Sequence, residues 1–413
     1  MSDKSPMSAP PAEVDHPQSP SSNICQTPSF WQAQSMASWG AGLVAVLVGY
    51  ASSVAIVLQA AQASDADTVW LNSWLLVLGL SLGLSCIFLS LRFRMPILTA
   101  WSTPGAALLA VSLVGYGPEA AVGAFLCSAC LTLLLGITGW SDRLMALIPA
   151  PLASAMLAGI LLQFGLQIFT QLGQAPWLVA GMLLVYVVMK RWQPRYAILW
   201  VLVVGILIAM AQPGGVPWDR LQWQWPQLHW ITPSWSWSAL IGVGLPLFIV
   251  TMSAQNVPGA AVMQSFGYQL PLSPVLRFLG GLNMLVAPFG GFAINLAAIT
   301  AAICANPQVD ADPTRRYAAA VAAGVFYLCT GLGASVVVLL LTALPSAFVA
   351  ALAGIALLGT IAAQGQQALA AETSREAALI TMLAAASGVS LFGLAAPFWG
   401  LLLGLAVYHC WRK

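Results

Sequence analysis

The chain has 413 residues, of which 60% are hydrophobic and only 6% are charged, and its formal net charge is +2. Ordinary soluble domains carry about 25% charged residues. The composition therefore excludes a soluble globular protein, predicts an all-α polytopic membrane protein, and gives no reason to expect a nucleic-acid partner. Residues 1–30 are polar and rich in Pro and Ser, without the basic start and apolar run of a signal peptide, so we predict a disordered tail.

Apolar segments divide the rest of the chain into two halves. A spanning helix needs about 20 apolar residues, and the first half, 31–211, contains seven predicted segments at 37–61, 69–91, 96–114, 118–140, 146–172, 177–189 and 196–211. A Trp-rich loop at 212–236 follows. The second half, 237–413, contains seven more at 237–258, 278–288, 292–304, 317–342, 348–363, 377–392 and 398–411. The fold predicted from sequence is thus fourteen segments in two repeats of seven.

The basic residues give an independent indication of topology. All of them except Arg220 fall in the tails or in loops that follow even-numbered segments. Because Lys and Arg favour the cytoplasmic ends of spans, both termini, including the 1–30 tail, are predicted to be cytoplasmic and the 212–236 loop external. The tryptophans of that loop form either an interfacial belt or a substrate gate. An odd number of spans per half inverts the second half, which is the inverted repeat of many secondary transporters in the cell (inner) membrane.

Two segments contain matching interruptions. The 96–114 segment contains Pro104-Gly105, which suits either a proline-kinked helix or a short extended piece at 97–102 followed by a half-helix that Ser102 or Thr103 caps. The 292–304 segment follows Gly290-Gly291. Interruptions at matching positions of the two repeats favour the extended piece with a half-helix. Non-helical backbone at membrane depth must form its hydrogen bonds with other protein groups or with water in a cavity.

The polar side chains deep inside the predicted membrane spans are neutral amides and hydroxyls. No Lys or Arg falls inside a predicted span, and every carboxylate lies in a tail, in a loop or at a predicted helix boundary. Amides can join helices, the interpretation preferred for Gln163, Gln167 and Asn283. The polar run before Pro258-Gly259, predicted to be another break, instead indicates a binding site.

A small anion suits two half-helix amino ends with neutral amides and no carboxylate. Aromatic neighbours suit an apolar ring beside the anionic end, so the predicted substrate is an aromatic carboxylate. The candidate substrate-binding residues are Tyr50, Trp101, Ser102, Thr103, Gly105, Gln255, Asn256, Phe292 and Asn295.

The chain resembles the benzoate/proton symporter (BenE) family over residues 30–413. The resemblance rests on WGAGLVAVLVGY at 39–50, TAWSTPG at 99–105, QNVPG at 255–259 and GGFAIN at 290–295. It implies import of benzoate with a proton by alternating access, and it is compatible with a homodimer. The chain is more distantly similar to nucleobase (uracil permease) and sulfate permease-type carriers, which implies a core domain of segments 1–4 and 8–11 and a gate domain of segments 5–7 and 12–14. Nucleobase carriers place glutamates on segments 8 and 10, where this chain has Gln255 and Asn295, which counts against nucleobase recognition.

Three functional classes compete. An enzyme would need a nucleophile with a base, or metal ligands, at depth, and all three histidines, His16, His229 and His409, lie in tails or near the surface. We therefore expect no catalytic residue, metal or cofactor. A channel would show a wet polar stripe. The remaining class is a secondary carrier, for benzoate or for another small organic anion or a nucleobase-like substrate, with a passive anion channel as the alternative.

The route of a coupled proton stays open at this stage. With no interior carboxylate or histidine, the proton could travel on the substrate as the neutral acid, on water near Tyr50 and Gln255, or through Glu119 at a helix boundary.

Overall fold

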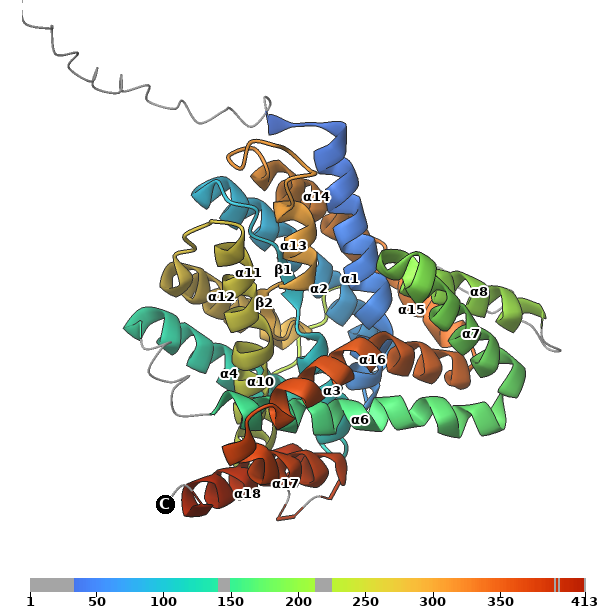
Figure 1. The fold of residues 1–413 in the computed structure, drawn as a ribbon, viewed down its shortest axis with the longest axis vertical. Coiled ribbons are helices and arrows are strands. Elements are labelled where there is room, and N and C mark those ends of the chain that lie inside the picture. The colour runs from blue at the N-terminus through green and yellow to red at the C-terminus, as the bar shows by residue number, and fades with distance from the viewer. Residues whose placement is uncertain (1–32, 140–148, 212–224, 390, 393, 412–413) are drawn as a thin grey trace, which may run out of the picture.

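A computed structural model describes residues 33–139, 149–211, 225–389, 391–392 and 394–411 (Figure 1). The predicted tail at 1–30 and residues 212–224 of the Trp-rich loop lie outside the described residues. The first half contains α1 (Met36–Gln62), α2 (Thr68–Phe93), β1 (Thr99–Trp101), α3 (Thr103–Ser112), α4 (Pro118–Thr138), α6 (Ala150–Gln174), α7 (Pro176–Trp192), the 3-10 turn η2 (Pro194–Tyr196) and α8 (Ala197–Ala211).

The second half begins with one long helix made of several pieces. These are α9 (Trp237–Ala239), the π-helical turn η4 (Leu240–Gly244), α10 (Leu245–Thr251), the π-helical turn η5 (Met252–Asn256) and α11 (Val257–Ser265). The remaining elements are α12 (Leu272–Val286), the 3-10 turn η6 (Ala287–Phe289), β2 (Ile294–Leu296), α13 (Ile299–Ala305), α14 (Tyr317–Leu332), α15 (Ala334–Ala343), α16 (Ser346–Leu369), the 3-10 turn η7 (Glu372–Ser374), α17 (Arg375–Ala386) and α18 (Ala396–Trp411).

Every predicted segment overlaps one of these elements, with some wrong boundaries. The helix expected at 317–342 is divided at Gly333, and the one expected at 377–392 ends at Ala386. Among the described residues six helices are long and apolar enough to cross a membrane, or seven if the two pieces of α1, bent by 42°, count as one span. Four further apolar helices have 10–17 residues. The chain is therefore a mostly helical membrane protein.

The predicted break at Pro258-Gly259 is wrong, because the helix runs through it as far as Ser265. A proline inside an α-helix removes one hydrogen bond and clashes with the carbonyl four residues earlier. The wider turn η5 immediately precedes Pro258, and η4 likewise precedes Pro246. We attribute the continuity of the helix to these π-helical turns, which remove the steric clash and let the helix continue.

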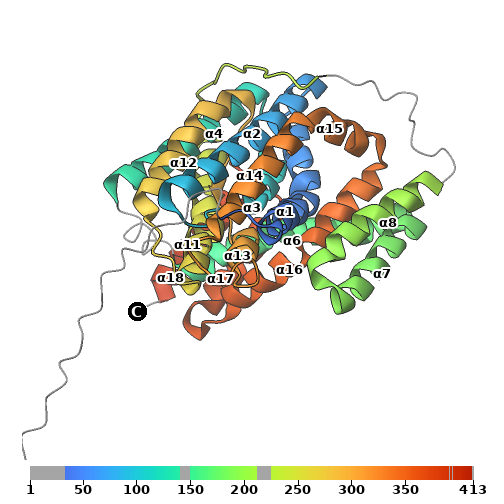
Figure 2. The same ribbon diagram turned by 90° about the horizontal axis from the view of Figure 1, so that it is seen from above.

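Small residues bring the helices of the two halves together. α2 lies along α14, and α4 lies along α12 (Figure 2). A Cβ atom on Gly79 of α2 would overlap the backbone of Gly331 in α14, so glycine is required at this crossing. Such contacts are how membrane helices gain packing energy without a hydrophobic driving force between them. α6 and α16 pack together, and α7 and α8 lie to one side of the molecule in both views (Figures 1 and 2).

The described end of the Trp-rich loop, 225–236, is attached to the helix ends beneath it. The His229 amide donates to Ser73 Oγ of α2 (2.9 Å), and the Ile231 amide donates to the Pro288 carbonyl of η6 (2.8 Å). The Ser234 amide donates to the carbonyl of Glu119 in α4 (2.9 Å). The tryptophan side chains in this stretch remain largely exposed, at Trp225, Trp230 and Trp235. The belt and gate interpretations therefore both stay predictions.

Candidate functional site

A short antiparallel ladder joins the two interrupted segments. β1 pairs with β2 in the register Thr99 with Leu296, Ala100 with Asn295 and Trp101 with Ile294. Two further backbone bonds extend it, from the Ser102 amide to the Ala293 carbonyl and from the Ala297 amide to the Leu98 carbonyl, each 2.9 Å. The predicted arrangement of an extended piece followed by a half-helix is thus present in both halves.

Two asparagine side chains form hydrogen bonds with the backbone groups on the edge of β2 that faces away from β1. Asn283 of α12 donates from Nδ2 to the Ile294 carbonyl (2.9 Å) and accepts from the Ile294 amide at Oδ1 (2.8 Å). Asn256 of η5 accepts from the Leu296 amide at Oδ1 (3.1 Å) and donates from Nδ2 to Asn295 Oδ1 (2.9 Å). Because buried backbone groups at membrane depth must all be paired, these amides take the place of a third strand.

Ser102 caps the start of α3. Its Oγ accepts from the Gly105 amide (2.9 Å), and Pro104 occupies the first turn. The serine is fully buried. Gly105 fits tightly beside it, because a Cβ there would lie 2.9 Å from both Ser102 Oγ and Leu247 Cδ1 of α10 and one of these side chains would have to shift. The predicted capped half-helix is confirmed.

A cavity of about 650 Å³ opens beside the start of α3. One wall comes from α1, the end of β1, η5 and the start of α13. The other comes from α7, α8 and α16. The polar residues that line it are Ser53, Thr103, Tyr186, Lys190, Gln255, Thr300, Tyr327, Thr360, Gln364 and Gln367. No Asp or Glu lines the cavity within the described part of the chain. Its size and mixed lining are those of a small-molecule site.

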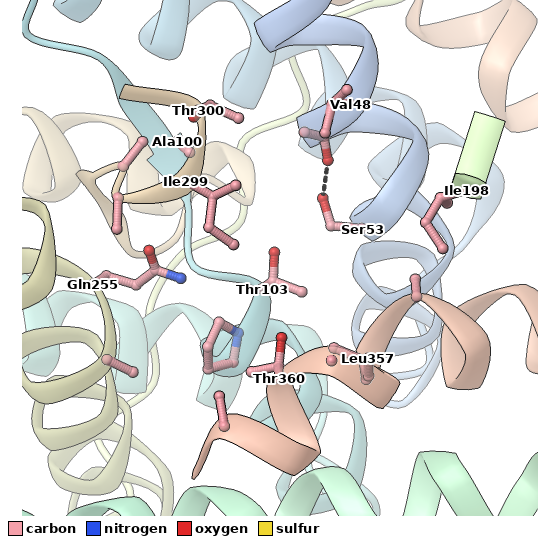
Figure 3. Close-up of a pocket in the computed structure, with 18 of the residues that line it drawn as sticks. Val48, Ser53, Ala100, Thr103, Ile198, Gln255, Ile299, Thr300, Leu357 and Thr360 are labelled. Carbon is pink, nitrogen blue, oxygen red and sulfur yellow. Dashed lines mark hydrogen bonds between the residues drawn. The ribbon is translucent and has the colours of Figure 1, made fainter. Parts of the chain in front are cut away.

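Three polar side chains point into the same space from different elements. Figure 3 shows the Gln255 amide facing Thr103 across the cavity, with Thr360 of α16 close by. Gln255 makes no side-chain hydrogen bond to any described residue and is only partly buried, so its amide is available to a ligand. Thr103 is the first residue of α3, where the backbone amide can have no partner within the helix.

An aromatic pair closes the cavity on the α1 side. Trp101 lines it, and its Nε1 donates to Ser53 Oγ (2.7 Å), which in turn donates to the Gly49 carbonyl (2.7 Å). Tyr50 packs edge-on against the Trp101 ring with centroids 5.1 Å apart. The indole is therefore held in one orientation, with its polar atom already engaged.

The structure separates the sequence candidates into two groups. Trp101, Thr103 and Gln255 line the cavity. The other candidates do not line it. Tyr50 contacts Trp101, and Phe292 packs edge-to-face with Trp74 and tilted against Phe125. The contacts described above involve Ser102, Gly105, Asn256 and Asn295.

The Asn295 amide is buried against Asn256 and the Ala293 carbonyl and does not line the cavity, so its part in substrate binding stays a prediction. Gln163 and Asn283 do join elements, as expected. Gln163 Nε2 donates to the Ala386 carbonyl of α17 (3.1 Å), and Asn283 binds β2.

The sequence analysis missed the opposite wall. Thr360, Gln364 and Gln367 recur at a helical spacing along α16 and so share one face, a pattern that could have identified them. Lys190 was assigned to a loop. Among the described residues no group of three or more His, Cys, Asp or Glu side chains could hold a metal ion.

Comparison with known proteins identifies close relatives. Residues 32–410 match the family described as benzoate membrane transport protein, BenE. The inner membrane protein YdcO of Escherichia coli (strain K12) is 46% identical over 368 residues, covering 89% of this chain and 94% of that protein. The benzoate membrane transport protein of Acinetobacter baylyi is 38% identical over 384 residues, covering 92% of this chain and 97% of that protein.

Solved structures share the fold. SLC26A9 has a TM-score of 0.61 at 15% identity, and the match covers 90% of this chain and 64% of that one. The transmembrane domain of a cyanobacterium bicarbonate transporter, BicA, has a TM-score of 0.59 at 16% identity, and the match covers 89% of this chain and 97% of that one. At these identities the likeness concerns the fold alone.

Proposed function

The chain belongs to the BenE family of benzoate membrane transport proteins, and from this premise we propose that it imports benzoate or a similar small aromatic carboxylate, together with a proton, by alternating access. Membership of a transport family excludes the enzyme interpretation. The inner membrane is the proposed location, supported by the relative of that description in Escherichia coli.

The observation that carries the proposal is the composition of the cavity. The Gln255 amide and the start of α3 offer hydrogen-bond donors, the Trp101 ring offers an aromatic face, and no carboxylate lines the space within the described residues. A carboxylate bound there would accept from Gln255 and Thr103 while its ring packs on Trp101. The dipole of the ten-residue α3 adds partial positive charge at the same end. α13 has only seven residues, so we do not assign its amino end an equal role in binding the carboxylate.

The wider architecture supports the same proposal. We propose fourteen segments in a 7+7 inverted repeat, with both termini cytoplasmic, a core domain built from α1–α4 and α9–α15, and a gate domain built from α6–α8 and α16–α18. The contacts of α2 with α14 and of α4 with α12 support it, since an inverted repeat would exchange these two pairs. The cavity, with one wall from each proposed domain, is where alternating access would expose a substrate.

Uptake of labelled benzoate into proteoliposomes tests the proposal. An imposed inward acid gradient should concentrate benzoate inside the vesicles, and unlabelled benzoate should compete. Equilibration without concentration, with a rate that does not saturate, would identify a passive anion channel. No uptake above protein-free liposomes would overturn the proposal.

Replacing Gln255 by alanine should weaken benzoate binding about tenfold or more, because a hydrogen bond to a charged group contributes about 1.5–3 kcal/mol. Equilibrium binding of labelled benzoate to purified protein measures this. Gln264→Ala is the matched control: the same side chain, exposed on α11 and outside the cavity. Equal affinity in the Gln255 variant and the control would remove Gln255 from the site.

Transport should be electroneutral if one proton crosses with each benzoate anion. Moving a net charge through 100 mV involves about 2.3 kcal/mol, so an uncoupled anion would respond strongly to voltage. We expect little change in the initial rate when a potassium diffusion potential is imposed at zero pH gradient. A substrate-induced current under those conditions would contradict one-for-one coupling and require a separate charge pathway.

A further inference from the structure

The wall of the cavity formed by α7 and α16 carries a charge. Lys190, in the last turn of α7, is the single charged residue among the described residues that line the cavity. Its side chain is exposed and forms no ion pair with any described residue. This cation has no ion-pair partner among the described residues, and no described carboxylate lines the cavity, so the ammonium can attract an anionic ligand.

Neutral amides accompany this cation. Gln364 and Gln367 of α16 line the same cavity, and α16 packs against α7. The two glutamines share one face of α16 with Thr360, which Figure 3 shows near Gln255, and lie about one and two helical turns beyond it. This polar group is therefore on a different wall from Trp101, Thr103 and Gln255.

We propose that Lys190, with Gln364 and Gln367, forms a second subsite that holds the carboxylate of the substrate at the mouth of the cavity, before it reaches Gln255 or after it leaves. The inference rests on the proposed function. The flexible four-carbon stem of lysine lets the ammonium follow a moving anion, and the exposed position keeps the interaction weak enough for release. The subsite holds the carboxylate through charge alone, whereas the central site adds hydrogen bonds from Gln255 and Thr103 and the ring of Trp101.

Lys190→Gln tests the subsite, with Arg191→Gln as matched control. Arg191 is the neighbouring basic residue on α7, is exposed, and does not line the cavity. We expect Lys190→Gln to raise the KM for benzoate about fivefold with little change in maximal rate, as for loss of one screened charge pair. Lys190→Arg should restore most of the affinity, and Arg191→Gln should behave as the unmodified protein.

Two further measurements separate charge from structure. Binding of benzamide, the neutral analogue, should be the same in the Lys190→Gln variant and the unmodified protein. Raising potassium gluconate from 50 to 500 mM should weaken benzoate binding by the unmodified protein, and this salt dependence should be much smaller in the variant.

Distinct results would overturn the two proposals. If the unmodified protein transports benzoate and Lys190→Gln leaves both KM and salt dependence unchanged, the subsite is wrong while the proposed function stands. Equal losses of benzoate and benzamide binding would also overturn it, because they would indicate a change of shape. If the unmodified protein neither binds nor transports benzoate, the proposed function fails and the subsite with it.

Discussion

Replacing Gly105 by leucine should abolish transport, with initial rates at least about a hundredfold lower. The first carbon of any side chain at this position would lie 2.9 Å from Ser102 Oγ and from Leu247 Cδ1. Ser102 would have to give up its bond to the residue 105 amide, a cap of about 1 kcal/mol, and overpacking against α10 costs about 1–3 kcal/mol more. The start of α3, where the carboxylate is proposed to bind, would move.

The measurement is benzoate uptake in proteoliposomes at matched protein content. Gly173→Leu is the control, because Gly173 lies in α6 with no atom near the position of an added Cβ. Gly105→Ala should give an intermediate rate. Transport by Gly105→Leu at the rate of the control would mean that the start of α3 plays no part in carrying the substrate.

Replacing Asn256 by alanine should destabilise the protein by about 2–4 kcal/mol. The change removes the hydrogen bonds of Asn256 with the Leu296 amide, with Asn295 Oδ1 and with Met252 Sδ, and it leaves the first two groups without these partners. Each unsatisfied buried group costs about 1–3 kcal/mol. Thermal unfolding in detergent, followed by loss of the monodisperse species, should show a clearly lower midpoint.

The adjacent residue provides the contrast. Gln255→Ala should lower affinity and leave the unfolding midpoint nearly unchanged, since its amide forms no hydrogen bond with a described residue. For Asn256 and Asn295, the double alanine variant should be destabilised by less than the sum of the single variants, because the two amides share a bond. An additive result, or an unchanged midpoint in Asn256→Ala, would contradict the role assigned to this pair.

Local sequence features predicted the part of the fold that local chemistry determines. Pro104-Gly105 shortly after Ser102 suits a capped helix start as well as a kinked helix, and the structure confirms the capped start. Gly290 adopts a positive φ of 94° that side chains rarely adopt, so the interruption before 292–304 was also readable. The prediction of a break at Pro258 was wrong. The packing around a proline decides whether it ends a helix or is accommodated by a wide turn.

The positions of the site residues depend on tertiary contacts that the sequence does not reveal. The register of β1 with β2 joins residues almost two hundred positions apart, and it is this pairing that turns Asn295 toward Asn256 instead of the cavity. Lys190 stands at the end of a helix, where a basic residue ordinarily indicates only the cytoplasmic boundary. Its place in the cavity lining follows from how α7 packs against α16, which no local pattern encodes.

The pairing of β1 with β2 limits the ways in which the protein can change shape. The strands are antiparallel, so α3 and α13 leave the ladder at opposite ends and are tied to each other through Ala100 and Asn295. A slip of one residue would turn every side chain of a strand to its other face, Trp101 included. We therefore expect α3 and α13 to move together in the proposed alternating-access cycle. In that cycle a substrate would meet the same Trp101 and Thr103 from either side of the membrane, and we expect a difference in affinity between the two sides to arise on the wall formed by α7, α8 and α16.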